Sequence, residues 1–226
     1  MSSEIPTGQA YLTAALGLAE RAARTQLPVI QRAAVAIADA LAAGQRFWAF
    51  GTGHSHLIVE EIWGRAGGLA DVTPILEPAL MLHEGLQKSS LLERQTGLAA
   101  TLLDIHPVAA GDCLLVISNS GRNSVPVEVA LGARKRGATV IALTSTAHSS
   151  SVTSRVPTGE RLFEVADLVI DNCGVPGDAV VPDEPHAVGA TSTMVGAMLV
   201  QALTVEVVGL MRHRGQPLQT LRSLNA

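Results

Sequence analysis

The stretch Phe50-Gly51-Thr52-Gly53-His54-Ser55-His56 indicates the fold of this chain more clearly than any other. A short apolar run precedes it and a segment of helical character follows it, as at the carboxyl end of a strand in an α/β protein. A second stretch of the same kind, Ile117-Ser118-Asn119-Ser120-Gly121-Arg122-Asn123, lies farther along the chain. Glycine and hydroxyl residues offer N–H and O–H donors to an anion, at the positive end of the following helix. Together the two turns predict one phosphate-binding pocket.

The rest of the chain alternates between apolar runs and helical segments, which predicts an α/β fold with a parallel sheet covered on both faces. Five strands are predicted, at residues 46–50, 71–76, 113–117, 139–143 and 168–171. Helices are predicted at 55–66, 89–106, 124–136 and 190–212, after an N-terminal helical pair at 10–26 and 28–43. In that pair Pro28 suits a first helical turn and Gly44 suits a C-cap. We expect one domain over 1–226, with a helical extension at 1–45 and an α/β core at 46–226.

Composition excludes several classes of protein. The 226 residues are 47% hydrophobic and 16% charged, enough to bury a substantial core. A net charge of -4 without a run of Lys or Arg argues against a nucleic-acid partner. The two cysteines form neither a metal-type spacing nor a disulfide framework, which suits the cytoplasm. No signal peptide and no apolar run of about 18 residues are evident, so we expect no membrane span.

A dinucleotide-binding fold is the obvious competitor, because Gly51-Thr52-Gly53 begins the G-x-G-x-x-G pattern. The third glycine of that pattern is replaced by His56. No clear acidic partner for a ribose follows the second strand at the usual distance, although Glu77 is near. A simple phosphate pocket is therefore favoured over a dinucleotide site, and no cofactor is expected.

The two loops, followed by Val140-Ile141-Ala142-Leu143-Thr144-Ser145, resemble the sugar isomerase (SIS) domain, which binds phosphosugars. The resemblance runs from about residue 46 to the C-terminus, and the opening helices are similar to those of phosphoheptose isomerases. Three further segments resemble sequences of one bacterial subfamily of stand-alone SIS proteins: Arg65-Ala66-Gly67-Gly68, Met81-Leu82-His83-Glu84-Gly85 and Asp171-Asn172-Cys173-Gly174. The resemblance implies a flavodoxin-like three-layer sandwich, a homodimer or homotetramer, and phosphate held by hydroxyls. By position, the phosphate ligands would be Thr52, Ser55, Ser118, Asn119, Ser120 and Asn123.

The resemblance does not supply the catalytic base. In phosphoheptose isomerases and muramic acid phosphate etherases a glutamate lies ten residues after the first-loop serine, where this chain has Arg65. Glu61 is spaced to pair with Arg65 along a helix, and we expect it to contact the sugar rather than to act as base. Glu84 is the better candidate, because a loop carboxylate at the rim of the sheet can reach substrate and be partly desolvated. The competing interpretation of Glu84 is a solvated or helix-capping carboxylate.

The histidines provide the remaining chemistry. His54 and His56 suit hydrogen bonds to sugar hydroxyls, and His83 beside Glu84 suits proton transfer near neutral pH. His186 lies in a region that supplies a catalytic or ring-opening histidine in some family members; a plain loop histidine is the alternative. His54 and His56 with His83 or Glu84 would also have the ligand types of a zinc site, but we expect no metal.

An open-chain aldose 6-phosphate has an acidic proton at C2, which one carboxylate can remove once the phosphate is anchored. Return of the proton at C1 gives a ketose, whereas loss of the C3 hydroxyl gives an unsaturated sugar. An N-acetyl group at C2 disfavours the first outcome. We therefore expect a lyase that dehydrates N-acetylglucosamine 6-phosphate or a close relative. An aldose–ketose isomerase and a non-catalytic phosphosugar sensor are the alternatives.

Overall fold

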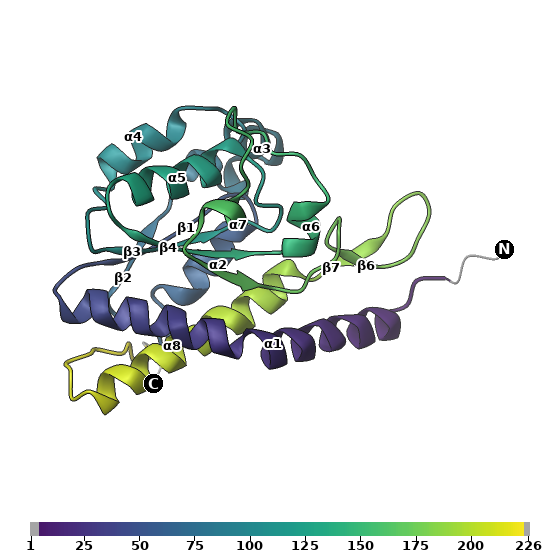
Figure 1. Cartoon of the computed structure of the whole chain (residues 1–226). Coiled ribbons are helices and arrows are strands. Elements are labelled where there is room, and N and C mark those ends of the chain that lie inside the picture. Colours follow the sequence, from purple (N-terminus) through teal and green to yellow (C-terminus); the bar gives the residue numbers. More distant parts are fainter. Residues whose placement is uncertain (1–4, 224–226) are drawn as a thin grey trace.

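The computed structural model describes residues 5–223 and has at its centre a five-stranded parallel sheet (Figure 1). The strand order is β2-β1-β3-β4-β5, so the chain moves from β1 to one side and then returns to the other. This order reverses between β1 and β3, which is where open α/β sheets bind ligands. The five strands are β1 (Phe47–Gly51), β2 (Val72–Ile75), β3 (Cys113–Ile117), β4 (Thr139–Thr144) and β5 (Leu168–Asp171). All five predicted strands and the parallel sheet are confirmed.

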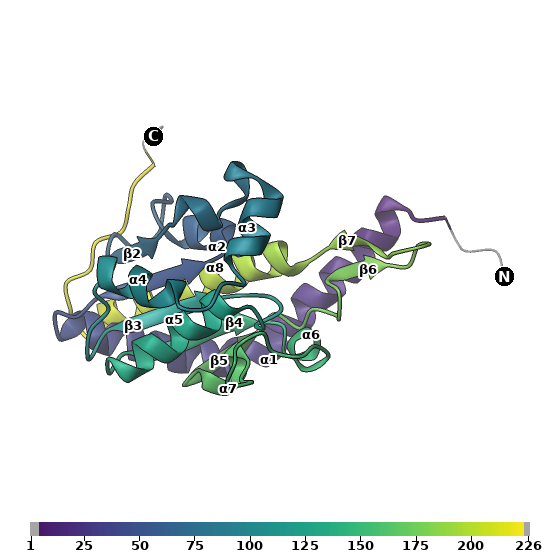
Figure 2. The same cartoon turned by 90° about the horizontal axis from the view of Figure 1, so that it is seen from above.

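Helices cover both faces of the sheet, which confirms the three-layer α/β sandwich (Figures 1 and 2). The two faces alternate along each strand: Phe47 and Ala49 of β1 join one core, whereas Trp48 and Phe50 join the other. The first core is completed by α1 (Gly8–Ala42), α2 (Ser55–Ile62) and α8 (Ser192–His213). The second is completed by α4 (Leu98–Ile105), α5 (Ser124–Lys135) and α7 (Leu162–Val165).

The predicted N-terminal helical pair is wrong, because residues 8–42 form the single 35-residue helix α1 with Pro28 inside it. Proline removes one helical hydrogen bond and costs about 3 kcal/mol within a helix. Between the two expected helices stands Leu27 alone, which favours helix and offers no turn. Buried residues on both sides of Pro28, among them Ala22 and Ile30, hold both halves of α1 in the same core. Burial along the whole helix therefore outweighs the local break. Gly44 has φ +74 after the helix, as its predicted role requires.

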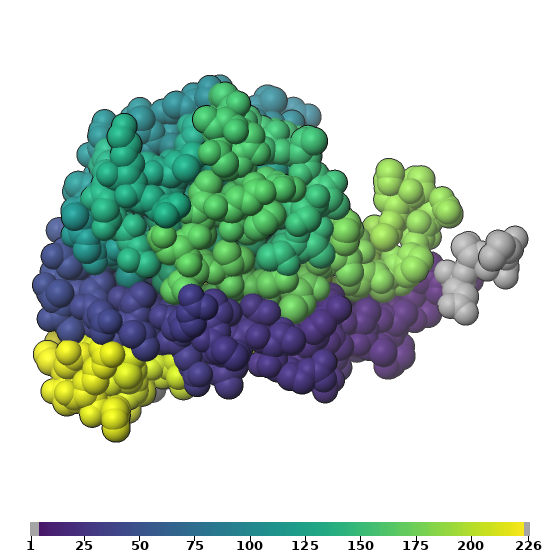
Figure 3. Space-filling model, viewed as in Figure 1, coloured from purple at the N-terminus to yellow at the C-terminus, as the bar shows by residue number. Residues whose placement is uncertain are grey.

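Several connections are shorter or more structured than predicted. The expected helix over 89–106 is two helices, α3 (Leu86–Leu92) and α4, separated at Gly97 with φ +86. Two 3-10 turns precede α3, η1 (Pro78–Leu80) and η2 (Leu82–Glu84), and α6 (Thr146–Ser150) lies within the Ser/Thr-rich turn. An antiparallel hairpin that the sequence analysis missed, β6 (Ala179–Val181) and β7 (Val188–Ala190), precedes α8. The hairpin and the N-terminal part of α1 project together from the α/β body (Figure 3), joined by a hydrogen bond of 2.9 Å from the Tyr11 hydroxyl to the Ala190 carbonyl.

The C-terminal helix α8 is long and apolar enough, by length and composition alone, to cross a membrane. Its buried residues, among them Val195, Leu199 and Val207, pack into the core shared with α1 and α2. This is the packing of a core helix, and it accounts for the apolar residues on the buried face. The expectation that the protein works in the cytoplasm stays a prediction.

Candidate functional site

Both glycine loops lie at the carboxyl edge of the sheet, on the two neighbouring strands between which the strand order reverses. Gly51 at the end of β1 pairs in register with Ile117 at the end of β3. The first loop, residues 52–54, leads into α2, and the second loop, residues 118–123, leads into α5. Because the two strands end at the same level, the loops face one common space. The predicted juxtaposition of the two loops is confirmed.

The first loop makes a tight turn that two glycines permit. A Cβ atom at Gly51 would lie 2.7 Å from the backbone oxygen of Ser55, so no larger residue fits there without movement. Gly53 has φ +56, and its N–H donates to the carbonyl of Leu80 at 2.9 Å. The Ser89 hydroxyl donates to the same carbonyl at 2.8 Å. The first loop is therefore held from outside the sheet, by the segment that follows β2.

The second loop is held by the neighbouring strands β4 and β5. The carbonyl of Asn119 accepts hydrogen bonds from the Ser145 N–H (3.1 Å) and the Thr144 hydroxyl (3.2 Å). The side-chain oxygen of Asn119 accepts from Asn172 at 2.8 Å. Within the loop, the Ser118 hydroxyl oxygen accepts from the N–H of Gly121 at 3.2 Å. These contacts fix the turn that carries Ser118 and Ser120, both of which line the cavity described below.

The two loops enclose a cavity of about 250 Å³. This is slightly below the roughly 300–1,000 Å³ of pockets for drug-sized ligands, so its size suits a small molecule such as one sugar. Within the described chain, no lysine or arginine lines it. Most of the lining is polar, and it comes from four segments: Thr52, Gly53, His54 and Ser55; Leu82, Leu86, Ser89, Ser90 and Glu93; Ser118, Asn119, Ser120 and Asn123; and His148.

Comparisons with known proteins place this site in a family. The sequence model of the SIS domain matches residues 10–145, more than half of the chain and both loops. The chain belongs to the SIS domain family. It is 48% identical to the UPF0309 protein of Halalkalibacterium halodurans over 204 residues, 89% of this chain and 84% of that protein.

Solved structures with low sequence identity share the fold of this SIS domain. A phosphoheptose isomerase from Francisella tularensis has a TM-score of 0.61 at 17% identity, with 88% of this chain and 95% of that chain covered. The Vibrio vulnificus NanR protein complexed with ManNAc-6P has a TM-score of 0.56 at 18% identity, with 92% of this chain and 64% of that chain covered. Both confirm the three-layer architecture.

Two helices of the SIS domain begin at the cavity without a side-chain cap. His54 and Asn123 are the N-cap residues of α2 and α5, and neither side chain accepts a hydrogen bond from its helix. The N–H groups of a first helical turn have no partner within the helix, and they carry the positive end of its dipole. Here the N–H groups of Ser55, His56 and Leu57 donate to the carbonyls of the first loop, and the Val125 N–H donates to the Glu93 carbonyl. What both termini offer an anion in the cavity is therefore the positive end of each helix dipole, beside the hydroxyls of Ser55, Ser118 and Ser120.

Two titratable residues that the sequence analysis missed line the cavity. Glu93, the residue after α3, is half-buried and accepts a hydrogen bond of 2.7 Å from the Thr52 hydroxyl to its Oε2. His148, in α6, accepts a hydrogen bond at Nδ1 from the Gly177 N–H at 2.6 Å. Neither lies in a glycine-rich motif, so only the tertiary structure brings them to the loops.

The predicted base Glu84 lies in η2, outside the cavity lining. Its exposed carboxylate forms an ion pair with Lys88, one helical turn farther along. The hydrogen bond and the charge of Lys88 together hold the pKa of Glu84 below its ordinary value. His83 is likewise exposed, and its ring lies 6.2 Å from the ring of His56. The partly desolvated carboxylate expected at this position is not found; catalytic roles for Glu84 and His83 stay predictions.

The remaining predicted site residues differ in whether they line the cavity. His54 and all six predicted phosphate ligands line the cavity. His56 is buried, with its Nδ1 against the Gly53 carbonyl, so it stabilises the turn. Glu61 pairs with Arg65 at 2.9 Å and accepts from Gln201 of α8 at 3.0 Å, on the far side of α2. His186 is exposed between β6 and β7. Sugar contacts by His56 and Glu61, and catalysis by His186, stay predictions without support from this geometry.

The imidazole and carboxylate groups do not form a metal site in the part of the chain that the structure describes. Over residues 5–223, no three side chains of His, Cys, Asp or Glu lie close enough together to hold an ion. His54 is exposed at the cavity, whereas His56 is turned into the protein, so the H-x-H pair does not act as a chelating unit.

Proposed function

We propose that this SIS domain binds a sugar phosphate in the cavity between the two loops, with the phosphate held by hydroxyl and backbone N–H groups. The observation that carries the proposal is the meeting of the Ser55, Ser118 and Ser120 hydroxyls in one cavity, at the positive ends of two helix dipoles. Such donors bind a phosphate without a basic side chain. The named functions of the structural neighbours, a phosphoheptose isomerase and a protein bound to ManNAc-6P, support the same class of ligand.

We further propose that Glu93 removes the proton at C2 of the sugar. The Thr52 hydroxyl donates to Oε2 of Glu93, which orients the carboxylate and leaves Oε1 for the substrate. A base must reach the proton that it removes, and Glu93 is the only carboxylate lining the cavity in the described chain. Glu84 was predicted for this role from the sequence, but its contact with Lys88 ties it outside the cavity.

His148 is suited to exchange a proton with a sugar oxygen. Because its Nδ1 accepts the Gly177 N–H, the neutral ring carries its proton on Nε2. A group that lines the cavity and has one defined tautomer can donate to a carbonyl or hydroxyl and recover the proton later. The pair Glu93 and His148 would thus supply a base and an acid to one small cavity.

The substituent at C2 decides the product once the C2 proton has been removed. With an N-acetyl group, loss of the C3 hydroxyl as water gives an unsaturated amino sugar, a dehydration. With a free hydroxyl or amine, proton return at C1 gives a ketose, an isomerisation. The ligand named for the NanR neighbour, an N-acetylated sugar phosphate, favours the first; the isomerase named for the Francisella neighbour favours the second. We propose the dehydratase, with the isomerase as the alternative.

Proton NMR in D2O, combined with mass spectrometry, tests both reactions on N-acetylglucosamine 6-phosphate, glucosamine 6-phosphate and heptose and hexulose phosphates. Loss of the C2 proton signal with loss of water supports the dehydratase, and deuterium uptake without loss of water supports the isomerase. Glu93→Gln should abolish exchange while phosphosugar binding persists, whereas Glu84→Gln should keep it. Binding without exchange for every sugar would instead support a sensor. Absence of binding would overturn the proposal.

We also propose that the protein is a homodimer or homotetramer. Leu12 and Leu16 lie one turn apart on α1 and are 54% and 66% exposed, and Val205 of α8 is 69% exposed. A second copy that covers these side chains would remove them from water. Light scattering during size-exclusion chromatography should give a mass twice or four times that of the monomer, and Leu12→Glu with Leu16→Glu should lower it. A monomeric mass for the wild-type protein would contradict this assembly.

A further inference from the structure

Beside the cavity lies a group of arginines that the proposed phosphate site does not use. Arg122 and Arg155 are neighbours through the backbone, because the Arg155 N–H donates to the Arg122 carbonyl at 2.9 Å. The Arg155 guanidinium also contacts the side-chain oxygen of Asn123, which lines the cavity. Arg94 donates to the hydroxyl of Ser90, another lining residue, at 2.8 Å. The three positive charges therefore border one edge of the cavity.

These arginines are not neutralised by carboxylates. Over residues 5–223, five other arginines form ion pairs within 4.0 Å, whereas Arg94, Arg122 and Arg155 form none. Arg122 donates to Thr153 at 3.3 Å, and its buried Nε has no hydrogen-bond partner. Burial, followed by repulsion from Arg122 and Arg94, lowers the pKa of Arg155. The charge of the nearby Glu93 offsets this repulsion only in part, because the pKa of Arg155 is lowered on balance. Like charges that gather without an ion pair raise the free energy of the empty site, and an anion relieves that repulsion.

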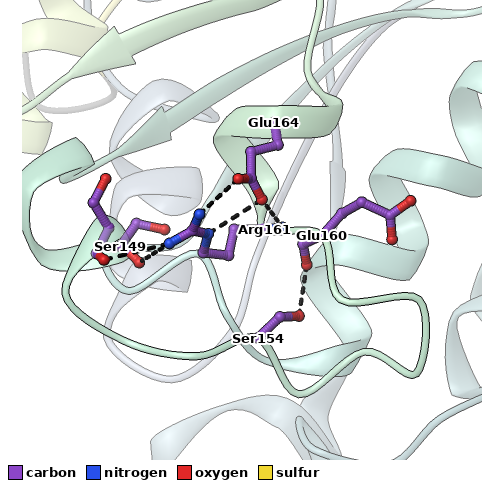
Figure 4. Close-up of polar contacts among 6 residues, drawn as sticks. Ser149, Ser154, Glu160, Arg161 and Glu164 are labelled. Atoms are coloured by element: carbon purple, nitrogen blue, oxygen red, sulfur yellow. Dashed lines mark hydrogen bonds and ion pairs between the residues drawn. The ribbon is translucent and has the colours of Figure 1, made fainter.

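The loop that carries Arg155 is fixed rather than loose (Figure 4). Arg161 donates to the Glu164 carboxylate at 2.6 Å and to the Ser149 carbonyl at 3.3 Å, tying the end of the loop to α6 and α7. The Ser154 hydroxyl donates to the Glu160 carbonyl at 2.6 Å. On the other side, the Val125 N–H donates to the Glu93 carbonyl at 3.0 Å, which places residue 94 beside the start of α5. The three arginines are thus presented on fixed backbone.

We propose that Arg94, Arg122 and Arg155 form a second anion site, which binds a second acidic group, carboxylate or phosphate, on the sugar phosphate held in the cavity. A guanidinium offers paired N–H donors that match both groups. The proposal rests on the proposed function, since the sugar must occupy the cavity. It narrows the substrate class from sugar phosphates in general to those with a further anionic substituent.

Matched ligand pairs test the second anion by isothermal titration calorimetry. One pair is glucose 6-phosphate and glucose 1,6-bisphosphate; the other is glucitol 6-phosphate and 6-phosphogluconate, which has a carboxylate at C1. We expect the doubly acidic member to bind about tenfold to a hundredfold more tightly, as charge-assisted hydrogen bonds would give. A preference in the first pair alone identifies the second group as phosphate, and in the second pair alone as carboxylate.

Arg94→Gln and Arg122→Gln, singly and together, should reduce that preference and leave the singly acidic ligand within about threefold of wild type. Lys135→Gln is the matched control, because it removes one exposed positive charge at the opposite end of α5. Thermal unfolding checks that each variant folds; the Arg94 guanidinium is exposed and donates to Ser90 of its own segment.

Three results would overturn the proposal. Equal binding within both pairs, with a sugar phosphate still bound, refutes the second site and leaves the phosphate site standing. Equal weakening of both members by the arginine variants would mean that the arginines bind the first phosphate. Retention of the full preference in the double variant would place the second anion elsewhere. If none of these ligands nor any sugar of the first panel binds the wild-type protein, the proposed function and this inference fail together.

Discussion

The two loops of the candidate site end neighbouring strands, yet they are supported in different ways. The second loop is fixed by the sheet itself, since Asn119 is hydrogen-bonded to Ser145 and Asn172 at the ends of β4 and β5. The first loop is fixed by the segment after β2, through Leu80 and through the bond from Thr52 to Glu93. The sheet-supported loop can hold an anion rigidly. The first loop is coupled to the carboxylate that we propose as the base, so under the proposed function the second loop would serve mainly binding and the first loop mainly the chemistry.

The largest expected effect is on the stability of the first loop, and it comes from adding a methyl group at Gly51. The new Cβ would lie 2.7 Å from the Ser55 backbone oxygen, so Gly51→Ala must displace the start of α2. At Gly121, where φ is +56, the close atoms are the hydroxyls of Ser149 (2.9 Å) and Thr144 (3.1 Å). We expect Gly51→Ala to cost about 3 kcal/mol of unfolding free energy and Gly121→Ala about 2 kcal/mol.

Urea unfolding measures both losses. Gly209→Ala is the control, because this glycine lies within α8 with no atom near its Cβ position, and alanine favours helix by up to about 1 kcal/mol. A Gly51→Ala protein as stable as wild type would show that the first loop is not as tight as described.

The next effect concerns phosphate binding by the two loops. Ser118→Ala with Ser120→Ala should raise the Kd for a sugar phosphate by about tenfold to a hundredfold, because each lost hydroxyl removes a hydrogen bond to a charged group. Ser55→Ala should raise it less, since the first loop contributes one serine to the cavity. Calorimetry compares these variants with Ser150→Ala, an exposed serine of α6 outside the cavity lining. Unchanged affinity in the double variant would place the phosphate elsewhere.

A smaller effect is expected from the supports of the loops. Asn172→Ala removes the donor to the Asn119 side chain, so the second loop loosens and the Kd should rise by up to about tenfold. Thr52→Val removes the donor to Glu93 and should lower turnover by a similar factor. Measured on the same substrate, Asn172→Ala should act mainly on binding and Thr52→Val mainly on kcat. The opposite pattern would contradict the division between the loops.

The sequence predicted correctly those parts of the site that depend on local pattern. Gly51, Ser55, Ser118 and Ser120 follow apolar strand runs directly, and parallel strands bring such loops to one edge. Glu93 reaches the cavity only because α3 folds back over the first loop, and no spacing in the sequence reveals that contact.

Two other differences between the structure and the expectations from the sequence have the same origin. Pro28 suits a helix start by local pattern, but the shared core holds α1 as one helix across it. Glu84 lies near the rim in the chain, as a cavity carboxylate would, yet its side chain pairs with Lys88 in the next turn. Local pattern predicts the elements and the loops; burial and side-chain pairing, which depend on the whole fold, decide the rest.

The smallest effect is expected from Glu84, which lies close to the first loop in the chain but is exposed. Lys88 holds its pKa below the ordinary value of 4.5, so the pair stabilises the folded state above that pH. This contribution should disappear as the pH falls through the lowered pKa, when the carboxylate takes up a proton in the folded protein. Because both side chains are largely in water, the contribution is small.

A pH series of thermal unfolding curves for wild type and Glu84→Gln therefore measures what Glu84 does. The wild-type Tm should exceed that of the variant slightly at pH 7, and the two should converge in acid. Turnover should be the same in both proteins, because Glu93 and not Glu84 contacts the first loop through Thr52. A loss of turnover in Glu84→Gln without a change in Tm would return the role of base to Glu84 and require this segment to move when the sugar binds.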